Sequence, residues 1–250
     1  MTAFESFGIP RFALNTHGRD FAVGDIHGAF DALQRAMEAI GFDARKDRLF
    51  SVGDLVDRGP ESHQVLAWLG QPWFHAISGN HDFMAWRSAL GDPFLEVDHL
   101  AHGGQWLEAL SSEELQCLGE QLSRLPIALE VETTAGLVGL VHADCPFDDW
   151  QHMHGIDRSR LAQRGSPAGQ CLWSTDRYDY RYCGTVKNIA AVVHGHVTLP
   201  SMVTLGNAYF IDTGGWRQSG SYFTFLDLQT RLHVTGPANE IRRGPSRRNR

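Results

Sequence analysis

Residues 50–62 read FSVGDLVDRGPES, where two aspartates and an arginine directly follow an apolar run that predicts a buried strand. Asp54, Asp57 and Arg58 therefore stand where a core element ends, and charged side chains there cost free energy unless something binds them. Pro60 lies near the start of the next helical stretch, ESHQVLAWLG, a position that proline tolerates. The stretch thus predicts a strand, a charged turn and a helix in succession.

The same succession occurs twice more in the first half of the chain. DFAVGDIHG at 20–28 leads into apolar residues with helical spacing, and PWFHAISGNHD at 72–82 leads into FMAWRSAL. Alternating strands and helices indicate an α/β arrangement, with chemistry expected at the carboxyl ends of the strands. From residue 126 onward strands dominate, and two or more of them are expected to build a second sheet packed on the first: PIALEVE, GLVGLVHAD, AAVVHGHV, YFIDTGG and YFTFLDL.

The length and composition of the chain indicate how many domains to expect. The 250 residues, of which 42% are hydrophobic and 20% charged, suit one sizeable domain, which we assign to residues 1–240. Residues 93–125 look helical and acidic, and we expect them to form a helical cap or insertion within that domain. The basic tail at 241–250 lacks apolar residues and is predicted to be disordered, with polyanion binding as the alternative.

Net charge and cysteine content limit where in the cell the protein is expected and which partners it is expected to bind. The net charge of −7, with no basic face expected on the folded part, argues against a nucleic-acid partner. No apolar run approaches the roughly 20 residues that span a bilayer, and the start of the chain does not read as a signal peptide. The four cysteines are scattered without a CxxC pair. We therefore expect a cytoplasmic protein with reduced thiols and no membrane partner.

Five turns each follow an apolar run and carry side chains that bind metals. Each one alone is weak evidence, because a Gly-Asp pair after a strand is usually only a turn. Together they indicate a site of carboxylate, imidazole and amide ligands without thiolate, which suits Mn²⁺, Fe or Zn²⁺. Their glycines suit turns that need positive φ or close backbone approach. The turns carry Asp25 and His27; Asp54, Asp57 and Arg58; Asn80, His81 and Asp82; His142 and Asp144; and His194 and His196.

This set of motifs resembles the calcineurin-like metallophosphoesterases, and more narrowly the bacteriophage lambda type of serine/threonine protein phosphatase and its bacterial relatives. The resemblance runs from about residue 21 to residue 228 and rests on SVGDLVDRG, PWFHAISGNHD, VHADCPFDDW, HGHV and YFIDTGG. It implies the metallophosphoesterase fold, of the four-layer α+β type, in which two packed mixed β-sheets are flanked by helices. It also implies a dinuclear metal-dependent phosphoprotein phosphatase.

The resemblance assigns ligands to two divalent metal ions, with manganese first among the candidates and iron, zinc or nickel as alternatives. Asp54 would bridge the two ions and fix their separation. A hydroxide shared by the metals would attack phosphorus directly, because bound water loses its proton easily. Asp25 and His27 would hold the first metal, and Asn80, His142 and His196 the second.

The resemblance also implies three roles around the substrate. Arg58 would clamp the phosphate through its planar guanidinium. His81 would protonate the leaving alkoxide, and Asp57 would orient His81 and keep it cationic. The relatives carry a second phosphate-binding arginine where this chain has Thr175, so either Arg177 takes that role or the site has one guanidinium fewer.

The remaining polar residues receive weaker interpretations. Asp82 is expected to support the site from outside the ligand set or to cap a helix. His194 is expected to support His196 rather than to bind metal. His99 and the other histidines outside the motifs are expected to have surface or packing roles. The stretch VDHLAHGGQW resembles a family loop near the site, but no chemistry is assigned to it.

Three functions are weighed from these residues. The leading one is hydrolysis of phosphoserine or phosphothreonine monoesters in a phosphorylated protein or small phosphoester, with phosphotyrosine left open. The first alternative is a symmetrical diadenosine tetraphosphate hydrolase, which shares GDIHG, GDLVDRGP and GNHD. The second is a non-catalytic phosphoprotein-binding module, for which Thr175 is the sole support.

Overall fold

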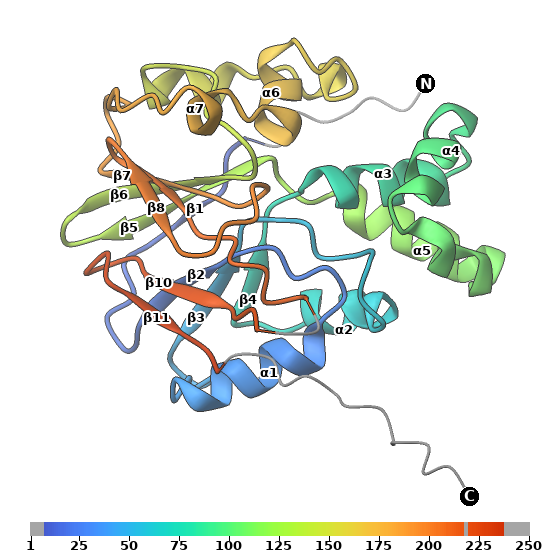
Figure 1. The fold of residues 1–250 in the computed structure, drawn as a ribbon, viewed down its shortest axis with the longest axis horizontal. Helices are drawn as coiled ribbons and strands as arrows, with labels where there is room; N and C mark the ends of the chain where they lie inside the picture. Colours follow the sequence, from blue (N-terminus) through green and yellow to red (C-terminus); the bar gives the residue numbers. More distant parts are fainter. Residues whose placement is uncertain (1–7, 218–219, 238–250) are drawn as a thin grey trace, which may run out of the picture.

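Two β-sheets packed on one another, with helices outside them, make up the architecture (Figure 1). The structure is a computed structural model that describes residues 8–217 and 220–237. Strands of both sheets run partly parallel and partly antiparallel. The predicted fold class, two packed mixed sheets flanked by helices, is therefore confirmed.

The first sheet has five strands in the order β11-β10-β2-β3-β4. β2, β3 and β4 are parallel to one another, so their carboxyl ends open on the same edge of the sheet. The three turns that carry Asp25, Asp54 and Asn80 follow these ends directly. The strands are β2 (Asp20–Val23), β3 (Arg48–Ser51), β4 (Phe74–Ala76), β10 (Thr224–Asp227) and β11 (His233–Thr235).

The second sheet has six strands in the order β1-β5-β6-β7-β9-β8. β6 and β7 are parallel, and the turns with His142 and His196 follow them. Four of the five strand segments expected after residue 126 lie in this sheet, whereas YFTFLDL forms β10 and pairs with β2 of the first sheet. The strands are β1 (Arg11–Phe12), β5 (Ala128–Thr133), β6 (Gly136–Val141), β7 (Ala191–His194), β8 (Val203–Leu205) and β9 (Ala208–Phe210).

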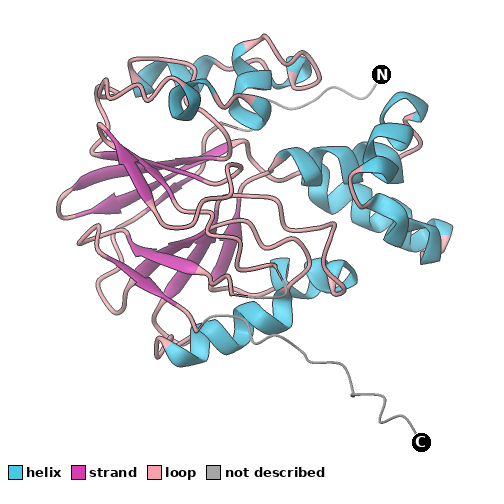
Figure 2. Cartoon of the chain, in the orientation of Figure 1, coloured by secondary structure: helices cyan, strands magenta, loops and turns pink. Residues whose placement is uncertain are grey.

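Helices lie on the outer side of each sheet (Figure 2). α1 and α2 lie beyond the five-stranded sheet, α6 and α7 lie beyond the six-stranded sheet, and α3, α4 and α5 project together to one side (Figure 1). The α-helices are α1 (Phe30–Ala39), α2 (Val65–Leu69), α3 (Asn80–Ala89), α4 (Pro93–Ala101), α5 (Ser112–Ser123), α6 (Pro167–Trp173) and α7 (Asp176–Asp179). Short 3₁₀ helices are η1 (Ser62–Gln64), η2 (Gly104–Ala109), η3 (Trp150–Gly155) and η4 (Arg158–Arg160).

One helix begins earlier than FMAWRSAL suggested. α3 starts at Asn80, inside the GNHD turn, because Asp82 accepts a hydrogen bond from the Gly79 N–H and so satisfies a main-chain donor at the start of the helix. Asn80 and His81 are thus held in the first turn of a helix. A loop would have left both side chains freer to move.

The segment from residue 93 to residue 125 forms α4, η2 and α5, which lie beside α3. Its assignment as a cap within a single domain at 1–240 stays a prediction. The predicted disorder of the basic tail concerns residues 241–250, which lie outside the described residues. Across residues 8–217 and 220–237, no helix is both long enough and apolar enough to cross a membrane.

The layer between the sheets is apolar and closed to solvent. Phe50 in β3 and Val52 directly after this strand lie in this layer, where they join Leu140 and Val193 of the second sheet. This shared core holds the strand ends of the two sheets together, so the turns beyond them face a common space.

Replacing Phe50 with alanine should lower the free energy of unfolding by roughly 3–5 kcal/mol, because a fully buried ring is lost from this layer. Urea unfolding followed by circular dichroism measures the change. Val97→Ala, at a position that is 74% exposed, is the control and should change the value by less than about 0.5 kcal/mol. A Phe50→Ala loss as small as that of the control would contradict this placement.

Candidate active site

Asp54 lies at the centre of the turns that gather at the strand ends. Its Oδ1 accepts a hydrogen bond from the His81 main-chain N–H at 2.8 Å and lies 3.4 Å from His142 Nε2. Its Oδ2 lies 3.5 Å from His27 Nε2. Two groups of potential metal ligands, each with its ligand atoms within 4.8 Å of one another, share this carboxylate: His27, Asp54 and His81, and Asp54, His142 and His196.

The hydrogen bonds of two imidazoles direct their lone pairs into this space. His27 Nδ1 lies 3.0 Å from the Val56 carbonyl oxygen, and His142 Nδ1 lies 2.8 Å from that of Val52. Since a carbonyl only accepts, both Nδ1 atoms carry the proton, and both Nε2 atoms are left as electron-pair donors. Burial lowers the pKa of His27 to about 3, which keeps this ring neutral.

The remaining predicted ligands complete the cluster. Asn80 Oδ1 lies 3.0 Å from both His142 Nε2 and His196 Nδ1. The His196 N–H donates to Asp25 Oδ1 at 3.0 Å. Burial, together with the negative charges of Asp212 and Asp54, raises the pKa of Asp25 well above its usual range. The site therefore concentrates negative charge and lone pairs, and a bound cation would offset both.

The backbone around the cluster is strained. Non-glycine residues in the left-handed region cost roughly 1–3 kcal/mol each and gather at functional sites. Such positive φ angles occur at His27 (45°), Asp54 (52°), Asp57 (72°), Arg58 (66°) and His196 (64°).

Two glycines allow the turns to approach one another. A Cβ at Gly79 would lie 2.3 Å from the Asp54 main-chain nitrogen, and one at Gly195 would lie 2.1 Å from Asp25 Oδ1. No larger residue fits at either position unless the turns move apart, because the added atom would collide with a main-chain atom or with a buried carboxylate. Asp82, fully buried, accepts from the Leu55 N–H at 2.9 Å as well as from Gly79, so it both caps α3 and joins the two turns.

Asp57 and Arg58 lie beside the first group of potential ligands and contact His81, which is a member of that group. His81 Nδ1 is 2.7 Å from Asp57 Oδ2. The Arg58 guanidinium donates to His27 Nε2 at 2.8 Å and to His81 Nε2 at 2.9 Å, and it stacks over the Trp216 ring. Arg58 is thus the cation that faces both imidazoles in this structure.

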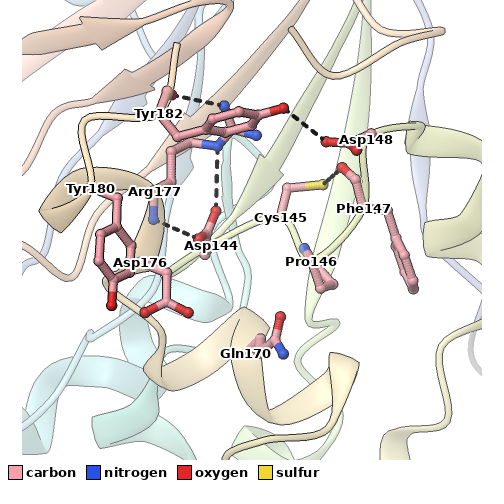
Figure 3. A pocket seen from close by; sticks show the side chains of 10 residues that line it. All are labelled: Asp144, Cys145, Pro146, Phe147, Asp148, Gln170, Asp176, Arg177, Tyr180 and Tyr182. Atoms are coloured by element: carbon pink, nitrogen blue, oxygen red, sulfur yellow. Dashed lines mark hydrogen bonds and ion pairs between the residues drawn. The ribbon is translucent and has the colours of Figure 1, made fainter. Parts of the chain in front are cut away.

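Arg177 lies in a different environment. Its guanidinium donates to the Gly184 carbonyl oxygen at 2.7 Å, and its Nε lies 3.5 Å from Asp144 Oδ1. Figure 3 shows it against Asp144 and Tyr182 in a cavity of about 430 Å³. A phosphate contact would require Arg177 to leave these partners, and its substrate-binding role stays a prediction.

The sequence interpretation missed four residues near the cluster. Asp212, fully buried, contributes negative charge next to Asp25, and its YFIDTGG motif was the available signal. Trp216 packs its ring edge-on against His27 at 4.8 Å. His99 is buried against Asp57, so its expected surface or packing role was incomplete, and Trp106 also contacts Asp57.

His194, which the sequence placed in a supporting role, is buried beside Phe210, and its ring nitrogens have no hydrogen-bond partner.

Carboxylates and imidazoles gathered at the edges of two packed sheets define a metal-dependent hydrolase. The family model for calcineurin-like phosphoesterases matches residues 21–229, and the chain belongs to this family. The family uses divalent metal ions, and the lone-pair directions of His27 and His142 around Asp54 fit such ions.

Relatives and solved structures agree with this family. The chain is 34% identical over 201 residues to serine/threonine-protein phosphatase 2 of Escherichia coli K12, covering 78% of this chain and 86% of that one. It is 26% identical over 265 residues to the symmetrical bis(5'-nucleosyl)-tetraphosphatase of Methylobacillus flagellatus, covering 84% and 92%. A serine/threonine phosphatase from Saccharomyces cerevisiae shares the fold, with a TM-score of 0.67 at 17% identity over 93% of this chain and 84% of that one.

Gly79→Ala should weaken Mn²⁺ binding by at least about 10-fold, because the added methyl group pushes the Asp54 turn away from its partners. Isothermal titration calorimetry measures the affinity. Gly155→Ala is the matched control, since nothing lies within 4 Å of a Cβ there, and it should bind as the wild type does. Equal affinities for the two variants would show that this close approach is unimportant.

Proposed function

We propose that the chain is a phosphomonoesterase that acts on phosphoserine and phosphothreonine in proteins and uses two divalent cations, manganese first among them. The observation that carries this proposal is the Asp54 carboxylate, which two groups of potential ligands share. His81 belongs to one of these groups, but its hydrogen bond to Asp57 favours a role as proton donor, so Asp25 takes its place among the ligands in the proposal. A cytoplasmic location remains a prediction of the sequence.

The ligand assignment is the one that the family resemblance implies, and the contacts around Asp54 support it. Asp25 and His27 would hold one cation, Asn80, His142 and His196 the other, with Asp54 between them. Bound divalent cations lower the pKa of water and neutralise phosphate oxygens. Arg58 Nη1 uses the His27 Nε2 lone pair, which can serve one partner at a time. If His27 Nε2 held a cation, this guanidinium group would be free to bind a phosphate.

Proton transfer is the task of His81. Its Nδ1 faces Asp57, so the proton for the leaving alkoxide must sit on Nε2, the atom that now faces Arg58. Asp57 stabilises the cationic imidazole that this requires. Burial raises the pKa of Asp57, but hydrogen bonds from His81 and His99 outweigh it and leave the pKa below its usual value. The carboxylate thus stays ionised beside His81.

His81→Asn should lower kcat for phenyl phosphate by roughly 10²–10⁴-fold, the range of a lost general acid. The loss for p-nitrophenyl phosphate should be far smaller, because p-nitrophenolate departs without a proton. Steady-state rates with added manganese measure both. Asparagine keeps the main-chain N–H that bonds to Asp54, so the ligand turn stays supported. Equal losses on the two esters would remove His81 from this role.

The relatives favour two substrates. Serine/threonine-protein phosphatase 2 is the more similar at 34% identity, and the symmetrical tetraphosphatase supports hydrolysis of a dinucleoside polyphosphate as the second candidate. The motifs GDIHG, GDLVDRGP and GNHD do not separate them, because both substrates present a phosphate to the same ligands, whereas PWF and HADCPFDDW favour the protein phosphatase.

A substrate panel separates the two candidates. Manganese-loaded protein should hydrolyse a phosphoserine peptide at a kcat/KM roughly 10-fold or more above that for diadenosine tetraphosphate, about 1.4 kcal/mol in transition-state stabilisation. Removal of the metal with a chelator should abolish both activities. A dominant dinucleotide rate would favour the tetraphosphatase function, and no hydrolysis of either would reject both.

A further inference from the structure

Asp57 has more hydrogen-bond donors than the orientation of His81 requires. Besides His81 at Oδ2, His99 Nε2 lies 2.9 Å from each carboxylate oxygen, and Trp106 Nε1 donates to Oδ1 at 2.7 Å. Asp57 and His99 are both almost fully buried. Three N–H groups therefore enclose one buried carboxylate.

Two of these donors come from the segment that the sequence left without chemistry. His99 lies in α4 and Trp106 in η2, 42 and 49 residues along the chain from Asp57. Both belong to VDHLAHGGQW. This segment therefore reaches the acid–base side of the site, although it supplies none of the six expected metal ligands.

The glycine pair in the same stretch lets the segment close on the site. Gly103 has φ of 109°, and a Cβ on it would lie 2.9 Å from the Arg58 main-chain nitrogen. A Cβ at Gly104 would lie 2.4 Å from His99 Nδ1. The backbone between the two donors thus packs directly on Arg58 and on the His99 ring.

We propose that His99 and Trp106 are positioning residues that hold the Asp57 carboxylate in the orientation at which it fixes His81. The proposal rests on the function proposed above, in which His81 is the general acid. It adds the inserted segment at 93–109 to the residues on which that acid depends.

The rotational freedom of a carboxylate explains why Asp57 needs more than one hydrogen-bond donor to stay in one orientation. The terminal torsion of an aspartate is broad, so a single hydrogen bond to His81 would leave the carboxylate plane poorly defined. Trp106 holds Oδ1, His81 holds Oδ2, and His99 bridges the two oxygens. Because the carboxylate is buried, each donor also offsets the cost of removing it from water.

The arrangement also fixes the tautomers. A carboxylate accepts only, so His99 carries a proton on Nε2 and His81 carries one on Nδ1. His81 Nε2 consequently points away from Asp57, toward the space that Arg58 occupies. Loss of either outer donor would let Asp57 turn and would change the direction of His81 without removing any expected metal ligand.

Trp106→Phe and His99→Phe test this proposal, because each keeps an aromatic ring and removes the N–H. In each, kcat for phenyl phosphate should fall on the order of 10-fold, with much less loss for p-nitrophenyl phosphate and little change in KM. His99→Gln, which restores an N–H donor, should recover part of the loss. Gln105→Ala, an exposed position between the two donors, is the control and should behave as wild type.

Equal losses on both esters, or no loss on either, would overturn the proposal, since a merely structural role does not depend on the leaving group. A second measurement needs no substrate: the nuclear magnetic resonance signal of the His81 Nδ1–H. This signal should shift in Trp106→Phe and His99→Phe but not in Gln105→Ala, and an unchanged signal would also overturn the proposal. If the wild type hydrolyses neither ester, the proposed function fails, and the resonance still decides the positioning claim.

Discussion

The close approach of the turns after β3 and β4 is the constraint on which the site depends. Gly79 leaves room for Asp54, whose carboxylate accepts the His81 N–H, while Asp82 accepts from both turns. Hydrogen bonds connect the two turns, and these bonds maintain the strained φ of Asp54. A metal ion would meet ligands that are already oriented, and little conformational entropy would be lost on binding.

Electrostatics explain why Arg58 faces the imidazoles. The cluster places Asp25, Asp54 and Asp212 close enough for their charges to raise the pKa of Asp25, and burial adds to this effect. A guanidinium near His27 partly offsets that charge, and its stacking on Trp216 holds it there. The same arginine is then within reach of a phosphate. In the proposed function, its position would link the charge balance of the ligand cluster to substrate binding.

The sequence predicted most of the fold because its strands are short apolar runs that end in recognisable turns. It also indicated that the turns after these runs carry metal-binding side chains, and the family resemblance selected six candidate ligands among them. It did not reveal His99 or Trp106, because helical spacing does not say which side chain turns toward a residue more than 40 positions away. The sequence could not show where the Arg177 guanidinium points either, because this depends on the side-chain rotamer and on hydrogen bonds to the carbonyl oxygens of Tyr182 and Gly184. The sheet that β10 joins depends on long-range pairing.

Two parts of the chain thus contribute to the candidate site in different ways. The strand ends of both sheets supply the candidate metal ligands, and the shared core keeps these ends in register. The proposed acid–base pair, Asp57 and His81, follows β3 and β4 as well, and the segment that carries His99 and Trp106 supplies two further hydrogen-bond donors to its carboxylate. Substitutions in that segment can therefore change how well a leaving group is protonated while the ligands stay in place. In a family with one metal-binding frame and several phosphoester substrates, an inserted segment of this kind offers a separate route to different leaving-group preferences.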